Sequence, residues 1–118
     1  MKYFRFEDLE IWQEAIELGD QLFDVSELAE NKKLYRFAEQ LRGAGMSISN
    51  NISEGSGSFS NKEFRQYLNI ARRSAFECAN ILIIYARRLI INDDQKNDLL
   101  LRLSTLCKRI TSFRKTLA

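Results

Sequence analysis

Basic side chains are the residues of this sequence best suited to bind a ligand. In the second half of the chain several of them recur at a spacing of seven residues, which places them on one face when the segment is helical. The planar guanidinium group of arginine matches the geometry of phosphate, so such faces are typical of nucleic-acid contacts. The candidate nucleic-acid-binding residues are Arg65, Arg72, Arg73, Arg102, Lys108, Arg109 and Lys115. Two other interpretations stay open, namely a solvated surface and salt bridges between subunits.

Residues that could carry out catalysis are sparse. The 118 residues include no histidine and only two cysteines, which excludes histidine-dependent acid–base catalysis, the usual zinc sites and the Glu-x-x-His ligands of di-iron bundles. Isolated carboxylates such as Glu54 and Glu77 have no nucleophile or base to pair with. No Gly-rich phosphate loop, helix-turn-helix or RNP-type aromatic motif is present. We therefore expect no enzymatic activity, no metal and no cofactor.

The composition is typical of a globular protein made of long helices. Hydrophobic residues make up 45% and charged residues 29%, and no proline interrupts the chain. The sequence contains neither an apolar run long enough to span a membrane nor the apolar segment of a signal peptide. We expect one domain over residues 1–118, in the cytoplasm and without a membrane partner.

Charge is distributed unevenly between the two halves. Residues 1–60 contain 6 Lys and Arg against 11 Asp and Glu, a net charge of −5, whereas residues 61–118 contain 12 against 5, a net charge of +7. Such asymmetry suggests that the basic half meets an acidic partner, either nucleic acid or the acidic first helix of another copy. The acidic residues of that helix are Glu10, Glu14, Glu17 and Asp20. Two solvated faces of opposite sign are the remaining interpretation.

Two segments of the second half have the period of amphipathic helices. Their apolar residues follow one another at alternating spacings of four and three. The seam positions are Phe64, Leu68, Ala71, Ala75, Cys78, Leu82, Tyr85 and Leu89, then Leu99, Leu103, Leu106, Ile110, Phe113 and Leu117. Ser60 and Glu63 predict a capping box at the start of the first segment, with Phe59 and Phe64 as a hydrophobic staple. The short connection Asn92–Asp94 predicts an antiparallel hairpin.

The two cysteines lie at comparable distances from that connection. Cys78 and Cys107 both face the predicted seam, so we expect them at similar levels of the hairpin. A cytoplasmic protein keeps its thiols reduced. We expect reduced core thiols in preference to a disulfide.

Two further helices are expected in the first half, over residues 8–25 and 32–54. The predicted inward positions are Leu9, Trp12, Ile16, Leu22 and Phe23 in the first, and Leu34, Phe37, Leu41, Ala44, Ile48 and Ile52 in the second. Residues 26–31, SELAEN, are expected to connect them. Four amphipathic helices joined by short connections predict an all-α fold, an antiparallel up-down-up-down four-helix bundle.

Two helix faces remain after the core is assigned. The second helix carries a stripe of small and polar residues, which would let another backbone approach closely. This stripe comprises Gln40, Gly43, Ser47, Asn50 and Glu54. We predict that it is covered, the alternative being a solvated face.

The third helix has more apolar surface than one seam uses, which predicts self-association. The candidate oligomer contacts are Tyr67, Ile70, Ile81 and Ile84 on one side of the seam, and Phe76 and Ile83 on the other.

The centre of the chain resembles a known family. The run QLRGAGMSISNNISEGSGSFSNKEFRQYLNIARRSAFE, residues 40–77, resembles the central signature of the 23S rRNA intervening-sequence proteins, also called four helix bundle proteins and often labelled ribosomal proteins. The opening FEDLEIWQEA, residues 6–15, resembles the start of the family's first helix. We interpret the polar stripe and the capped turn in this run as a structural packing motif, and its candidate residues are Gln40, Gly43, Ser47, Asn50, Asn51, Glu54, Gly55, Ser60 and Glu63. We expect Asn51 and Glu54 to bond the capped start of the third helix.

The resemblance implies a left-handed four-helix bundle that assembles as a ring, commonly a homopentamer, in bacteria. It implies no enzymatic activity. A relative, the accessory variability protein of diversity-generating retroelements, is a basic pentamer that works with a reverse transcriptase and nucleic acid. The chain departs from the family pattern at Gly43 and Ser58, where basic residues are usual, and lacks the family's Phe-Pro step. These departures move the predicted nucleic-acid contact from the turn to the third and fourth helices.

Together these features predict a non-enzymatic homo-oligomer that contacts RNA or a nucleic-acid enzyme through basic helix faces. The alternative is an oligomeric scaffold or adaptor that binds only protein.

Overall fold

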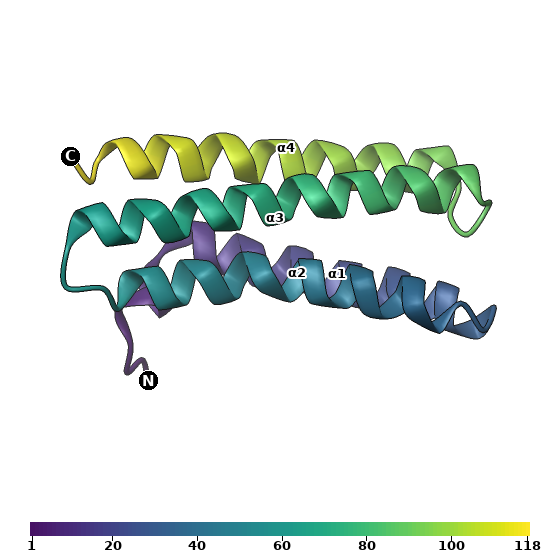
Figure 1. The fold of residues 1–118 in the computed structure, drawn as a ribbon, viewed down its shortest axis with the longest axis horizontal. Coiled ribbons are helices and arrows are strands. Elements are labelled where there is room, and N and C mark those ends of the chain that lie inside the picture. The colour runs from purple at the N-terminus through teal and green to yellow at the C-terminus, as the bar shows by residue number, and fades with distance from the viewer.

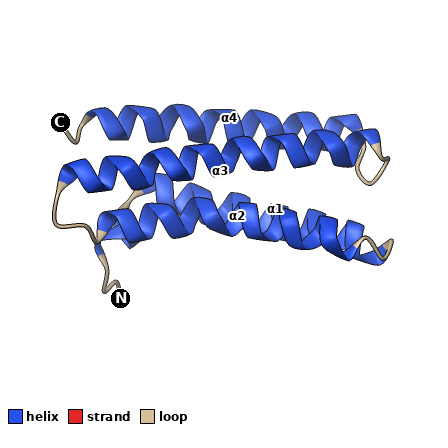
Figure 2. Cartoon of the chain, in the orientation of Figure 1, coloured by secondary structure: helices blue, strands red, loops and turns tan.

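Four long helices and no strand make up the structure, a computed structural model that describes residues 1–118. A single 3-10 turn, η1 (Arg5–Asp8), precedes them. The helices are α1 (Glu10–Asn31), α2 (Tyr35–Ser56), α3 (Asn61–Arg87) and α4 (Asp93–Lys115). Successive helices run in opposite directions in a bundle of 44 × 25 × 23 Å, as Figures 1 and 2 show. The predicted all-α antiparallel bundle is confirmed.

The topology gives the bundle two distinct ends. Figure 1 shows both chain termini and the α2–α3 turn at one end, and the α1–α2 and α3–α4 turns at the other. α2 packs against both α1 and α3, and α4 packs on α3 and approaches α1 less closely. No helix combines the length and the apolar character that a bilayer span requires.

One cluster of 27 buried residues forms the core. On α3 the predicted seam from Phe64 to Tyr85 is almost completely buried, and on α4 the seam positions from Leu99 to Ile110 are buried as well. Both periodic segments were therefore interpreted correctly. On α2, Gly45 and Gly55 are buried among these side chains. A Cβ atom on Gly55 would lie 2.6 Å from Cβ of Tyr67, so the glycine is what allows α3 to pass this closely.

The helix starts match the sequence in part. Ser60 Oγ accepts a hydrogen bond of 3.1 Å from the Glu63 N–H, but the Glu63 side chain does not return to the Ser60 backbone, so the predicted capping box is half formed. Phe59 is fully exposed and makes no staple, because Phe64 turns inward to meet Phe113 at 5.6 Å between ring centroids. Asn92 forms a complete capping box with Gln95.

Two helix ends were predicted wrongly. α1 continues through SELAEN to Asn31, because Ser26 and Ala29 are buried against α2. α3 ends before Leu89, which has φ 62° and is 82% exposed instead of closing the seam. Lys33 has the same left-handed backbone, φ 63°, after α1. At each site the following N–H bonds a carbonyl five residues back and closes the helix.

The predicted inward face of α1 was also wrong in part. Ile16 and Phe23 are exposed, as is Leu34 before α2, whereas Ile11, Ala15, Leu18, Leu22 and Ala29 face the core. Leu22 packs against Gly45 of α2, where a Cβ atom would lie only 3.2 Å from Leu22 Cδ1, so α1 lies close to α2 on this face. Phe23 instead lies under the Arg42 guanidinium, 5.2 Å from the ring centroid.

Candidate functional site

Two of the candidate arginines on α4 form ion pairs with α1 of the same chain. Arg102 Nη2 lies 4.0 Å from Glu17 Oε2, and Arg109 pairs with Glu14. These side chains line a groove between α1 and α4. The salt bridges that the sequence suggested between subunits are thus formed at these two arginines within one chain.

Arg65 is engaged in a different way, at the end of the bundle that carries the termini. Its guanidinium donates to the Leu117 carbonyl oxygen at the end of α4. In return, Arg114 Nε donates to the Arg65 carbonyl oxygen at 3.1 Å. The two arginines therefore fasten the start of α3 to the end of α4.

Arg72 belongs to a groove of about 540 Å³ between α3 and α4. Its guanidinium lies 4.8 Å from the centroid of the Phe76 ring. Lys108 lies on the other rim, and Leu100 and Leu103 supply apolar lining. The groove combines an apolar surface with cations at its edges.

Both cysteines are buried and free. Burial raises the pKa of the Cys78 thiol to about 12. Burial also raises the pKa of Cys107, and the nearby Arg72 charge opposes that effect. Neither thiol therefore has the lowered pKa of a reactive cysteine. No group of three His, Cys, Asp or Glu residues is arranged to hold a metal ion.

Three of the seven candidate cations make no ion pair, side-chain hydrogen bond or cation–π contact in the chain. Arg73, Lys108 and Lys115 are exposed and make no salt bridge in the chain. Arg73 is on α3, and the two lysines are on α4. The structure therefore divides the predicted site into engaged arginines and a smaller set of free cations.

The small stripe of α2 has one covered position in the single chain. Ser47 Oγ lies 2.7 Å from Ser74 Oγ of α3, whereas Gln40, Gly43, Asn50 and Glu54 are exposed. A Cβ atom on Gly43 would meet nothing within 4 Å. A cover for this stripe would have to come from another chain.

Asn51 and Glu54 do not bond the start of α3 as expected. Asn51 Nδ2 donates to the Ser47 carbonyl oxygen at 2.7 Å and to Ser47 Oγ at 3.0 Å. Asn51 therefore holds the Ser47–Ser74 contact in place, because its amide is within reach one helical turn away. The Glu54 side chain is exposed and makes no hydrogen bond or ion pair in the chain.

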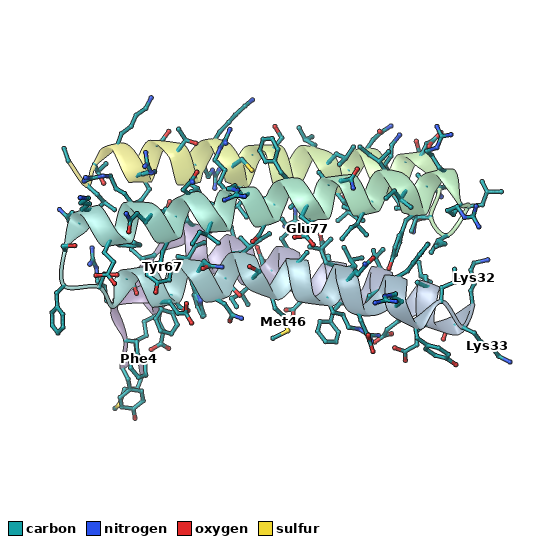
Figure 3. The ribbon with its side chains drawn as sticks, viewed as in Figure 1. Phe4, Lys32, Lys33, Met46, Tyr67 and Glu77 are labelled. Carbon is teal, nitrogen blue, oxygen red and sulfur yellow. The ribbon has the colours of Figure 1, made fainter.

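The candidate oligomer contacts fall into three groups. Ile81 is only 8% exposed and is covered by its own chain, so it is not available to a partner. Tyr67 is half-buried beside Gly55. Figure 3 shows Tyr67 and Glu77 on the side of α3 that faces α2. Exposed apolar side chains remain on α3 at Ile70, Phe76, Ile83 and Ile84.

A group of cations that the sequence did not bring together lies at the end with the α1–α2 and α3–α4 turns. It comprises Lys32, Lys33, Arg36, Arg87 and Arg88, all exposed. Figure 3 shows Lys32 and Lys33 extending away from the helices at this end. No spacing signal links residues 32–36 to residues 87–88, and only the antiparallel order of the helices indicates that the two turns share an end.

Comparison with known proteins agrees with this fold. The sequence model of the 23S rRNA-intervening sequence protein family matches residues 7–112. A crystal structure of a protein of unknown function from the S23 ribosomal protein family of Bacteroides thetaiotaomicron VPI-5482 superposes with a TM-score of 0.83. It is 23% identical, and the match covers 89% of this chain and 98% of that one. No curated protein matches the chain.

Proposed function

Since the chain belongs to the 23S rRNA-intervening sequence protein family, we propose that it is a non-enzymatic bundle that self-associates and contacts RNA or a nucleic-acid enzyme through basic surfaces. The observation that carries the proposal is the combination of exposed apolar positions on α3 with cations that have no partner in the chain. The exposed apolar positions suit contacts between copies of the chain, and the unpaired cations suit an anionic ligand. A cytoplasmic, bacterial setting is part of the proposal.

Self-association is supported by the two flanks of α3. Ile70 and Ile84 are exposed on the flank next to α2, and the Gly43 position of α2 is uncovered as well. Phe76 and Ile83 are exposed on the flank next to α4. Contacts between two different surfaces of identical chains are heterologous, and they close into a ring when the rotation permits. We propose a homopentameric ring of this kind.

Contact with RNA is supported by the cations that form no ion pair, among them Arg73, Lys108 and Lys115. Unpaired lysines and arginines on a rigid bundle can neutralise phosphates and release the counterions condensed around them. Such binding needs no catalytic group and no cofactor. The arginines engaged inside the chain, such as Arg102 and Arg109, are expected to contribute less.

The second candidate function is a scaffold that binds only protein. The pairs Arg102–Glu17 and Arg109–Glu14 favour it, because they remove two arginines from the proposed nucleic-acid surface. The acidic outer face of α1 and the basic residues of α3 and α4 would then serve contacts between proteins.

Light scattering after size exclusion, with and without a structured RNA, tests both candidates. The measurement is made at low salt and at about 0.15 M salt, where charges on the surface are screened beyond about 8 Å. We expect a discrete oligomer whose mass increases with RNA at both salts. An oligomer whose mass does not change when RNA is added would favour the protein scaffold. A monomeric mass would contradict the proposed self-association.

A further inference from the structure

The two turns at one end of the bundle form a basic surface, here named the loop-end patch. It consists of Lys32, Lys33 and Arg36 from the α1–α2 turn and Arg87 and Arg88 from the α3–α4 turn. The two hairpins are joined just behind it, where Tyr85 Oη donates to the Phe37 carbonyl oxygen at 2.8 Å. The surface is therefore held on a rigid base although its residues are far apart in the sequence.

The two turns at this end contain more basic than acidic residues. Residues 31–36 and 87–94 contain 5 Lys and Arg against 2 Asp and Glu, a net charge of +3. One of the two acids, Asp93, pairs with Lys96 at 3.5 Å. The opposite end, residues 1–8, 54–63 and 114–118, contains 5 against 4, a net charge of +1. The two turns at the loop end therefore carry a larger net positive charge than the opposite end.

Helix stabilisation does not account for the whole patch. Lys32 and Arg88 follow the last turns of α1 and α3, where a cation interacts favourably with the helix dipole. Arg36 lies in the first turn of α2, where the same dipole disfavours a cation. It has no ion-pair partner in the chain. The Arg36 charge therefore destabilises the first turn of its own helix, and no acidic side chain of the chain compensates it. A ligand outside the chain would account for a cation at this position.

The segment that carries Lys32, Lys33 and Arg36 also contains an aromatic residue. Tyr35, next to Arg36, is 57% exposed and makes no side-chain hydrogen bond. Proteins that bind single-stranded nucleic acid combine cations that contact the phosphates with aromatic rings on which bases stack. Tyr35 with the five cations provides both elements.

We infer that the loop-end patch binds single-stranded RNA, with its cations on the phosphates and Tyr35 stacked on a base. This inference rests on the proposed function and deepens it, because it moves the RNA from the helix faces to one end of the bundle. On the helix faces Arg65, Arg72, Arg102 and Arg109 are held by contacts within the chain. At the loop end all five cations are exposed and free of ion pairs.

Two variants matched in charge test the inference. The loop-end variant carries Lys32→Gln, Arg36→Gln, Arg87→Gln and Arg88→Gln. The control variant carries Lys2→Gln, Arg5→Gln, Lys62→Gln and Arg114→Gln, which removes four exposed cations at the opposite end of the bundle. Each lowers the net charge by the same amount. The probe is fluorescein-labelled oligouridine, followed by fluorescence anisotropy over a range of salt concentrations, and circular dichroism verifies that both variants are folded.

We expect the loop-end variant to lose at least about tenfold in affinity, and its log–log salt slope to fall by about 0.7 for each phosphate contact removed. The control variant should keep its affinity within about threefold and its slope. Tyr35→Ala, which leaves the charge unchanged, should weaken binding by about tenfold through lost stacking. Arg36→Gln alone provides a milder variant if the fourfold change impairs folding, and it should lower the slope by about 0.7.

The possible failures are distinguishable. Equal losses in both fourfold variants, or a loss only in the control, would overturn the inference and leave the proposed function in place. Equally tight binding of poly-glutamate would overturn the assignment to RNA. Absence of RNA binding by the unmodified protein would overturn the proposed function and this inference together.

Discussion

The hydroxyl of Tyr85 donates a hydrogen bond of 2.8 Å to the backbone carbonyl oxygen of Phe37, linking the end of α3 to the start of α2. The Tyr85 side chain is completely buried, and its ring stacks on Phe37 with the centroids 6.4 Å apart. This pair connects the two helical hairpins at the level of the loop-end patch.

Tyr85→Phe should destabilise the protein by about 1 kcal/mol, because the variant keeps the ring packing and loses one hydrogen bond at a buried position. The free energy of unfolding in urea measures the change. Tyr35→Phe is the matched control, since Tyr35 is exposed and its hydroxyl has no partner in the chain. Equal stabilities of the two variants would contradict a role for the Tyr85 hydroxyl.

The same tyrosine predicts a loss of stability at high pH. Burial raises the pKa of Tyr85 from 10 to about 12 in the folded protein. Below pH 10 the phenol is neutral in both states, so it contributes no pH dependence. Between about pH 10 and 12 the unfolded chain releases a proton that the folded chain retains, so the free energy of unfolding falls as the pH rises. Urea titrations between about pH 9 and 11 should show a smaller decrease for Tyr85→Phe than for the unmodified protein.

The two cysteines should react with a thiol reagent only after unfolding. Burial raises the pKa of Cys78 to about 12 and raises that of Cys107 as well, and the thiolate is the reactive form. An Ellman assay at about pH 8 should therefore release colour slowly in buffer and rapidly in denaturant. Fast reaction in buffer would mean that the α3–α4 groove opens around Cys107.

Two glycines of α2 should respond to alanine in opposite directions. In Gly55→Ala the new methyl group would lie 2.6 Å from Tyr67 Cβ and 2.8 Å from Phe64 Cδ1, which should destabilise the protein by about 1–3 kcal/mol. Gly43→Ala meets nothing within 4 Å in the single chain and should stabilise the helix by about 1 kcal/mol. Thermal unfolding of the two variants provides the comparison. A stabilised Gly55→Ala variant would show that α2 and α3 do not approach this closely.

Charges on the α2 flank of α3 should dissociate the proposed oligomer. Ile70→Glu with Ile84→Glu places two carboxylates on exposed apolar positions, which costs little in a monomer and much in a buried interface. Light scattering should report a smaller species for this variant. Leu101→Glu, at an exposed leucine of α4 outside this flank, is the control and should keep the mass of the unmodified protein. Unchanged mass in the double variant would exclude this flank from the interface.

Removing the engaged arginines should affect stability more than RNA binding. Arg102→Gln and Arg109→Gln each break an ion pair with α1, and exposed pairs of this kind contribute about 0–1 kcal/mol. Lys108→Gln has no pair to lose and is the control for stability. We expect less than a twofold change in RNA affinity for either arginine variant, because its guanidinium is already occupied. A tenfold loss of RNA affinity in either variant would indicate that RNA binds to the α4 face that carries these arginines.

Features that depend on neighbouring residues were predicted correctly from the sequence, whereas some features that depend on contacts between helices were not. The seams of α3 and α4, the Ser60 and Asn92 caps and the bundle itself were predictable, because period and capping depend on residues within a few positions of each other. The inward face of α1 was not, since Ile16 and Phe23 are as apolar as the residues that are buried. Which of them faces the core depends on how closely α2 approaches.

The sequence by itself determined the number of helices, their antiparallel order and most of the core, because each helix has one dominant apolar stripe that must be buried. The tertiary structure alone decided which charges meet. Arg102 and Arg109 face Glu17 and Glu14 across 85 and 95 positions of sequence, and Lys32 and Arg88 share one end across 56. These relationships depend on the rotation and axial position of one helix relative to another, and the packing of the shared core sets both.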